Sequence, residues 1–273
     1  ALDLFGDPSL RDEVSPFVQL LWEQGAAWEQ KVMASGSHEA LDLSGFEGEE
    51  KERLTLEAME RGEPLIYSGR ISADDLVGIP DLLRKIPGGY VPIDIKSGAG
   101  EEGGGDDSDG KPKLPYAVQL CLYVDVLERL GRSPGRTAYI YDVHGQEVLY
   151  DLEAPRGPKV PLTLWQEYQD RLAEARAIVA SGGLCRGALS SKCKQCHWYT
   201  ACTMELKSND DLTLIPQLGR ALRDVMVDTI GGVGEFAQCN PDAFLNGKKT
   251  VFKGLGPDRL RTFHLRARLL TDP

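Results

Sequence analysis

Gly78-Ile79-Pro80-Asp81 and Ile93-Asp94-Ile95-Lys96-Ser97-Gly98 are the two short segments that decide the fold of this chain. In a β-strand, residues two apart project from the same face, so Asp94 and Lys96 should project together. Asp81 is expected to end the strand-like run that begins at Gly78, and the turn Pro87-Gly88-Gly89 between the segments predicts a hairpin that brings Asp81 alongside them. We therefore expect two carboxylates and a lysine to meet at one place on a sheet.

Helical and β-type patterns alternate around these segments, which predicts an α/β core. Apolar residues at helical spacing predict helices over residues 15–34, 47–61, 116–130 and 162–180. Short β-type runs predict strands at residues 65–67, 76–79 and 90–95, and two more within residues 136–150. Residues 101–110 contain no apolar side chain and predict an exposed, flexible loop.

The chain of 273 residues carries a net charge of −11, which at first argues against a nucleic-acid partner. The charge is uneven, however, because residues 243–273 hold seven Lys and Arg against two Asp. Net charge therefore does not decide the question. No apolar run approaches the roughly 20 residues that a membrane span needs, and the cysteine usage described below suits a cytoplasmic protein.

Two carboxylates side by side in a partly buried site repel each other unless a cation lies between them. Oxygen ligands of this kind suit Mg²⁺ or Mn²⁺. A neighbouring lysine could position an attacking water and offset the charge that develops on a phosphate. The alternative is a solvated strand face with a weak ion pair between Asp94 and Lys96, because an Asp-x-Lys strand is common.

Four motifs occur in an order that resembles the RecB-like branch of the PD-(D/E)XK nuclease superfamily, over roughly residues 16–202. They are Gly25 with Glu29, Gly78 with Asp81, Asp94 with Lys96, and Gln119 with Tyr123. The resemblance implies a restriction-endonuclease-like fold, a central mixed sheet flanked by helices. It also implies a metal-dependent deoxyribonuclease with an exonuclease-like action.

The resemblance assigns a role to each motif. Glu29, Asp81 and Asp94 are the expected ligands of Mg²⁺ or Mn²⁺, and Lys96 is the expected catalytic lysine. Gln119 and Tyr123 are expected to lie over the site and contact DNA. Their spacing of four residues independently places them on one helix face.

Four cysteines, Cys185, Cys193, Cys196 and Cys202, fall within 18 residues, and such crowding favours a metal over disulfides in an intracellular protein. Spacing alone favours structural zinc. The tail from Cys193 to Cys202 resembles the segment that supplies three ligands to the [4Fe-4S] cluster of iron–sulfur RecB-like nucleases, and we favour that cluster. Those relatives often place the fourth cysteine before the first motif. Here either Cys185 substitutes for it, or the ligand lies upstream of Ala1.

The last 60 residues contain two similar pieces, each leading through a short turn into a helix. The second piece, Lys253-Gly254-Leu255-Gly256-Pro257, resembles a helix-hairpin-helix turn. Backbone N–H groups near Gly254 and Gly256, with Lys253, would bind a DNA phosphate without reading sequence. The first piece has Gln217 where glycine is usual. The alternative is two helical hairpins that only pack on the core.

The sequence therefore predicts a nuclease domain over residues 1–205, including the cysteine cluster, and a small all-α DNA-binding domain over residues 206–273. The expected reaction is phosphodiester hydrolysis in single-stranded DNA or at DNA ends. A helicase or another DNA-processing protein is a candidate partner. The rival hypothesis is a catalytically silent nucleic-acid-binding module that retains the nuclease fold.

Overall fold

The structure is a computed structural model that describes residues 1–35, 39–103, 110–157 and 160–272. It divides into two compact units: Gln19–Arg176, and Ala1–Val18 together with Ala177–Pro273. The cysteine-rich segment therefore belongs to the same compact unit as the C-terminal helices. The functional boundary near residue 205 stays a prediction. Among the described helices, none is long and apolar enough to cross a membrane.

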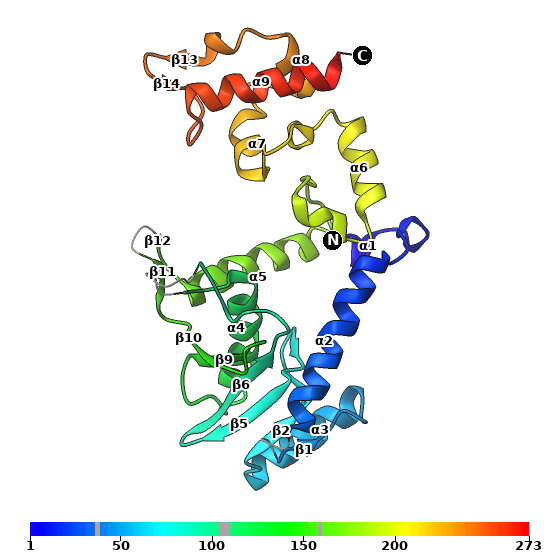
Figure 1. Cartoon of the computed structure of the whole chain (residues 1–273), viewed down its shortest axis with the longest axis vertical. Helices are drawn as coiled ribbons and strands as arrows, with labels where there is room; N and C mark the ends of the chain where they lie inside the picture. Colours follow the sequence, from blue (N-terminus) through cyan, green and yellow to red (C-terminus); the bar gives the residue numbers. More distant parts are fainter. Residues whose placement is uncertain (36–38, 104–109, 158–159, 273) are drawn as a thin grey trace. The chain divides into compact units, whose positions relative to one another are not determined.

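The unit Gln19–Arg176 is built on a mixed six-stranded sheet of order β1-β2-β5-β6-β9-β10 (Figure 1). Its strands are β1 (Leu41–Asp42), β2 (Leu65–Tyr67), β5 (Leu82–Ile86), β6 (Gly89–Ile95), β9 (Thr137–Tyr141) and β10 (Glu147–Asp151). The β1–β2 and β6–β9 pairs are parallel, and the other neighbours are antiparallel. Short two-stranded sheets accompany it: β3 (Ile71–Ala73) with β4 (Leu76–Gly78), β7 (Glu101–Glu102) with β8 (Lys111–Pro112), and β11 (Pro155–Gly157) with β12 (Val160–Thr163).

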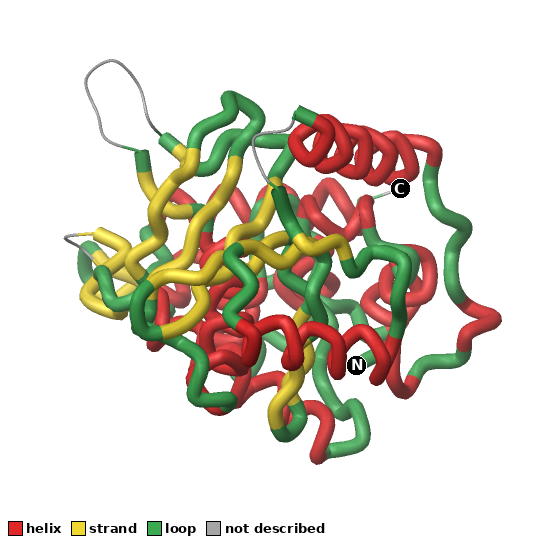
Figure 2. The backbone as a smooth tube through the Cα atoms, turned by 90° about the horizontal axis from the view of Figure 1, so that it is seen from below, coloured by secondary structure: helices red, strands yellow, loops and turns green. Residues whose placement is uncertain are grey.

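Helices cover both faces of this sheet (Figures 1 and 2). They are α2 (Pro16–Ala34), α3 (Gly48–Arg61), α4 (Leu114–Arg129) and α5 (Leu164–Ala180). Strand alternation divides the core in two: Leu82, Ile93 and Ile95 pack with Val32 and Trp28 of α2. On the other face, side chains such as Leu83 and Ile140 pack with α3, α4 and α5. The predicted α/β fold class is confirmed.

One expectation about the first segment is wrong in detail. The sequence places Asp81 at the end of a strand that begins near Gly78, but β4 ends at Gly78 and Asp81 directly precedes β5. Pro80 explains the break, because it has no N–H to donate to a strand partner. The predicted hairpin is present, with Leu82 opposite Ile93 and Ile86 opposite Gly89. Residues 104–109, most of the predicted loop, lie outside the described residues, and the flanking pairs form β7 and β8.

The other unit contains short helices and one long one: α1 (Leu2–Phe5), α6 (Tyr199–Ser208), α7 (Arg220–Met226), α8 (Val233–Gln238) and α9 (Pro257–Thr271). The hairpin β13 (Leu245–Asn246) and β14 (Lys249–Thr250) precedes α9, and 3₁₀ turns occur at Pro8–Leu10, Ser191–Gln195, Leu212–Leu214 and Pro241–Phe244. Apolar side chains including Leu218, Phe236 and Phe263 form its core. The predicted C-terminal helices are therefore confirmed.

A buried ion-pair group holds this unit together. Asp211 is fully buried, and its carboxylate pairs with the nearly inaccessible Arg223 of α7 at 3.0 Å. The same carboxylate pairs with Arg186, next to Cys185, at 2.9 Å, and Arg223 also donates to the carbonyl of Gly187 at 2.8 Å. The cysteine segment and α7 are thus joined through one carboxylate.

Candidate active site

Asp94 of strand β6 and Lys96, which directly follows the strand, project on the face of the sheet that α4 covers. Asp94 is only 1% exposed, and Lys96 forms an ion pair with its Oδ2. Gln119 of α4 completes the contact, because Lys96 Nζ donates to Gln119 Oε1 at 3.1 Å and Gln119 Nε2 donates to Asp94 Oδ1 at 3.3 Å. The shared face that the period of two predicts is therefore present.

Asp81 joins this group through the β5–β6 hairpin. Its Oδ2 accepts a hydrogen bond of 2.6 Å from the backbone N–H of Ile95. Burial, reinforced by the negative charge of Asp94, raises the pKa of Asp81 to about 8. Burial also raises the pKa of Asp94, although the adjacent Lys96 ammonium opposes the shift. Two carboxylates are thus held together in a setting that disfavours their ionised forms.

Tyr123 links the helix motif to the glycine of the first segment. Its hydroxyl accepts from Gln119 Nε2 at 2.7 Å and donates to the carbonyl of Ile79 at 3.4 Å. A Cβ added at Gly78 would lie 2.6 Å from the Tyr123 ring, closer than packed carbon atoms approach. Glycine at position 78 therefore makes room for the tyrosine, and the two motifs are parts of one packing arrangement.

Glu29 lies apart from this group, on the α2 side of the sheet. Tyr67 donates a hydrogen bond of 2.9 Å to Glu29 Oε1, and Tyr67 packs in the same apolar cluster as Ile93 and Ile95. The negative charge of Glu29 nevertheless contributes to the raised pKa of Asp81, so the two carboxylates are within electrostatic reach. Tyr67 was not singled out from the sequence, although its place two residues after Leu65 puts it on the α2 face.

The carboxylate oxygens of Asp81 and Asp94 are the donor atoms that this site offers to a divalent ion. The Asp94 Oδ2 atom is buried with the Lys96 ammonium as its partner, and the Asp81–Asp94 repulsion would be relieved by a cation. Within the described ranges, however, no three His, Cys, Asp or Glu side chains converge closely enough to hold a metal ion. Mg²⁺ commonly binds through one or two carboxylates and keeps several waters, so the Asp81–Asp94 pair fits it.

The four clustered cysteines are free thiols: Cys185, Cys193 and Cys196 precede α6, and Cys202 lies within it. Cys193 Sγ accepts from the backbone N–H of Ser190 at 3.3 Å, and Cys196 Sγ accepts from the N–H of Trp198 at 3.4 Å. Burial raises the pKa of Cys202, and the charges of the other three cysteines add to the shift. The thiols are therefore near neighbours, although no described triad of them converges on a common point.

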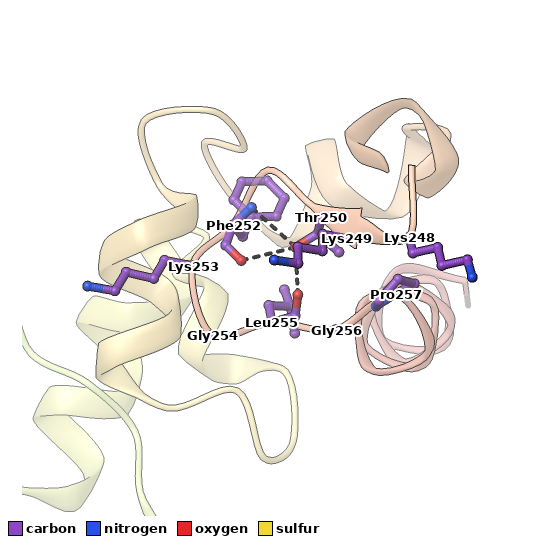
Figure 3. A pocket seen from close by; sticks show the side chains of 9 residues that line it. All are labelled: Lys248, Lys249, Thr250, Phe252, Lys253, Gly254, Leu255, Gly256 and Pro257. Atoms are coloured by element: carbon purple, nitrogen blue, oxygen red, sulfur yellow. Dashed lines mark hydrogen bonds between the residues drawn. The ribbon is translucent and has the colours of Figure 1, made fainter. Parts of the chain in front are cut away.

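The C-terminal turn surrounds a cavity of about 450 Å³, lined by Lys248, Lys249, Thr250, Phe252, Lys253, Gly254, Leu255, Gly256 and Pro257 (Figure 3). Gly254 has φ +79°, and Gln217, at the matching place in the first piece, has φ +68°. The two turns therefore share a left-handed φ at this position, with Gln217 bearing a side chain where glycine is favoured. Arg266 donates to Gln217 Oε1 at 3.0 Å, so the first turn already has a partner.

The family to which the chain belongs follows from a comparison of its sequence with known families. The PD-(D/E)XK nuclease superfamily matches residues 6–203, nearly three quarters of the chain. The chain belongs to the PD-(D/E)XK nuclease superfamily. Members of this superfamily are nucleases that generally use divalent metal ions, in agreement with the paired carboxylates and lysine. Among curated proteins, none matches the chain.

Proposed function

We propose that this chain is a Mg²⁺- or Mn²⁺-dependent deoxyribonuclease of the RecB-like branch that hydrolyses phosphodiester bonds in single-stranded DNA or at DNA ends. One observation carries the proposal: Asp81, Asp94 and Lys96 are held together by the β5–β6 hairpin and by Gln119. A solvated strand face with a surface ion pair would not bury a carboxylate to 1% exposure.

Each residue of the group has a defined task in this proposal. Asp81 and Asp94 would hold the divalent ion, with Glu29 as a third, more distant carboxylate. When bound, the ion supplies Lewis-acid polarisation of the scissile phosphate. Lys96 donates hydrogen bonds to the attacking water and offsets negative charge on the phosphate oxygens. Gln119 orients the Lys96 ammonium, and Tyr123 orients Gln119 through a 2.7 Å hydrogen bond.

The test is hydrolysis of end-labelled single-stranded DNA with Mn²⁺ and with EDTA. We expect cleavage that needs the ion and is lost in Lys96→Ala. Binding of DNA without cleavage by the wild-type protein in Mn²⁺ would instead support the catalytically silent module. The complete set of two aspartates and a lysine argues against that module, since buried carboxylates that serve no purpose lower stability.

The C-terminal turn is proposed to bind the DNA backbone as a helix-hairpin-helix does. Support comes from Lys248, Lys249 and Lys253, for which the described residues contain no acidic partner. In Figure 3, Lys248 and Lys253 extend from the loop in opposite directions. The nearby Arg261, in contrast to these lysines, already has an acidic partner, because it pairs with Asp242 at 2.9 Å. Phosphate binding at this turn would therefore rest on lysines and on backbone N–H groups near Gly254 and Gly256.

The cysteine segment is proposed to bind a structural metal, a [4Fe-4S] cluster in preference to Zn²⁺. The crowding of the four thiols within 18 residues of sequence supports this, as do the two backbone N–H groups that donate to Cys193 and Cys196. Anaerobically purified protein should be brown, with broad absorbance near ~400 nm, if thiolate-bound iron is present. Colourless protein with one zinc per chain would overturn the [4Fe-4S] proposal but support a structural metal site. Protein that contains neither iron nor zinc would overturn the proposal of a structural metal site altogether.

A further inference from the structure

A second cavity, of about 500 Å³, lies beside the catalytic strand. Its walls come from α2 and from the chain just after β6 and β9, and they include Gln24, Trp28, Lys31, Ser97 and Val143. The volume is in the range of about 300–1,000 Å³ that small-molecule sites occupy. Ser97 immediately follows Lys96 and Trp28 immediately precedes Glu29, so the cavity walls are continuous in the chain with the segments that carry two of the proposed catalytic residues.

The wall supplied by α2 is a continuous face of the helix. Leu21, Gln24, Trp28 and Lys31 are spaced by three, four and three residues, which places them along one side of the helix. None of the residues that line the cavity is acidic, although the chain as a whole carries a net charge of −11. A polyanion can therefore approach here without facing a lining carboxylate.

Trp28 gives the cavity its chemical character. Its indole N–H is buried and has no hydrogen-bond partner among the described residues, a condition that calls for an explanation in a folded protein. The Lys31 ammonium lies 5.4 Å from the centre of the indole ring. An aromatic ring with a cation beside it is the combination that binds an unstacked base together with its phosphate.

We propose that this cavity binds one unpaired nucleobase of the DNA strand that Asp81, Asp94 and Lys96 would cleave. This inference rests on the proposed nuclease function and adds to it a requirement for an unstacked base. Trp28 supplies the stacking surface, Lys31 meets the adjoining phosphate, and Gln24 and Ser97 offer hydrogen bonds to the base edge. Duplex DNA away from an end cannot place a base there without unpairing it.

The test is binding without catalysis, measured by fluorescence anisotropy of labelled oligothymidylate with the full chain in EDTA. Trp28→Leu should weaken binding on the order of tenfold. A strand of the same length that lacks its bases should bind the variant and the wild type equally. Trp22→Leu is the matched control, because Trp22 lies on the same helix, is 62% exposed and does not line the cavity.

Ala27→Leu provides a second variant, which fills the cavity without removing atoms from the core. It should weaken oligothymidylate binding as Trp28→Leu does, with thermal unfolding unchanged. Affinities within twofold of wild type for both variants would overturn the proposal, as would an equal loss on the base-free strand. Cleavage with Mn²⁺ is scored separately. If the variants lose oligothymidylate binding but the wild type does not cleave DNA, the nuclease function is refuted and the base-binding cavity stands. If the wild type cleaves DNA but the variants bind oligothymidylate normally, the base-binding cavity is refuted and the nuclease function stands.

Discussion

Asp81 Oδ2 accepts a hydrogen bond of 2.6 Å from the backbone N–H of Ile95, the residue between Asp94 and Lys96. This bond crosses the β5–β6 hairpin one residue before β5 begins at Leu82, which pairs with Ile93. The position of one carboxylate is therefore fixed by the backbone of the strand that carries the other. A shift of the hairpin register by one residue would separate the two acids and turn Lys96 to the opposite face.

Lys96→Ala and Asp94→Ala should each lower the single-turnover rate of DNA cleavage by about 10²–10³-fold or more. The reason is that Lys96→Ala removes the positive charge that offsets the phosphate, and Asp94→Ala removes a ligand of the divalent ion. DNA binding in EDTA should remain within a few-fold of wild type, because most of the contact lies elsewhere. Rapid-quench measurements at saturating Mn²⁺ would check this, and a wild-type rate in either variant would contradict the assignment.

Gly78→Ala should reduce cleavage on the order of tenfold through a residue that touches no substrate. The added Cβ would meet the Tyr123 ring at 2.6 Å and push Tyr123, and with it Gln119, from its place. Gly45→Ala is the matched control, since a Cβ there meets nothing within 4 Å. Cleavage rates and melting temperatures are measured for both variants. Equal cleavage rates in the two variants would show that Tyr123 can move aside without affecting catalysis.

Asp81→Asn should stabilise the metal-free protein while it abolishes metal-dependent cleavage. The folded-state pKa of Asp81, about 8, lies above the ordinary value, so the folded chain binds more protons than the unfolded chain between those limits. Stability of the wild type should therefore fall as pH rises from about 4 to about 8. The gain from Asp81→Asn at the upper end should be on the order of 1 kcal/mol, because Asp81 is partly exposed and solvent screens part of the repulsion.

Chemical denaturation in EDTA across this pH range measures the effect. Mn²⁺ added at the upper end should restore stability to the wild type and leave Asp81→Asn unchanged. A wild-type stability that rises with pH through this window would show that the carboxyl is ionised without penalty in the folded chain.

Tyr67→Phe should weaken Mn²⁺ binding roughly tenfold, because Tyr67 holds Glu29 by a 2.9 Å hydrogen bond. Burial, with the bond to Glu29 next in effect, raises the Tyr67 pKa, so the hydroxyl remains a donor at neutral pH. Electron paramagnetic resonance of Mn²⁺ reports binding directly, and kcat at saturating ion should change little. Tyr139→Phe, in the same apolar cluster, should leave the affinity unchanged. Equal affinities in both variants would exclude Glu29 from the metal site.

Lys253→Gln should lower the affinity for long DNA and reduce the slope of log affinity against log salt by about 0.7–0.9. The Lys253 ammonium is expected to release one counterion from the DNA. Arg261→Gln is the comparison, because Arg261 already pairs with Asp242 at 2.9 Å and should change the slope less. Titrations at several salt concentrations give both slopes. Cleavage of short oligonucleotides should be unaffected in either variant.

The sequence predicts the parts of the site that depend on local periodicity. Asp94 and Lys96 share a face because strand residues alternate, and Gln119 and Tyr123 share one because helix residues recur every 3.6 positions. The β5–β6 hairpin follows from Pro87-Gly88-Gly89. These relationships involve neighbours in sequence or one tight turn, so the pattern of residues is enough to find them.

The sequence does not predict those features of the site that depend on which helices and strands pack together. Glu29 meets Tyr67 because α2 lies on the face of the sheet opposite α4, and no periodicity within either segment encodes that choice. The cavity beside Trp28 is likewise formed by a helix and two later strand ends. The place of Asp81 before β5, and not at the end of a preceding strand, follows from Pro80, which has no N–H to donate to a neighbouring strand.

Asp211 determines where the chain can be divided. A cut between Arg186 and Asp211, or between Asp211 and Arg223, would remove one of the two arginines that pair with the buried Asp211 carboxylate, and it would leave that carboxylate with half of its charge partners. Removal of the C-terminal helices at residue 207 would also remove Asp211, the partner of Arg186 beside the cysteine segment. A change in DNA affinity could then come from the lost helices or from a loosened cysteine segment. For gene fusion, domain exchange or recombination between related chains, the stretch from Arg186 to Arg223 behaves as one inheritable block, which must be kept or discarded whole.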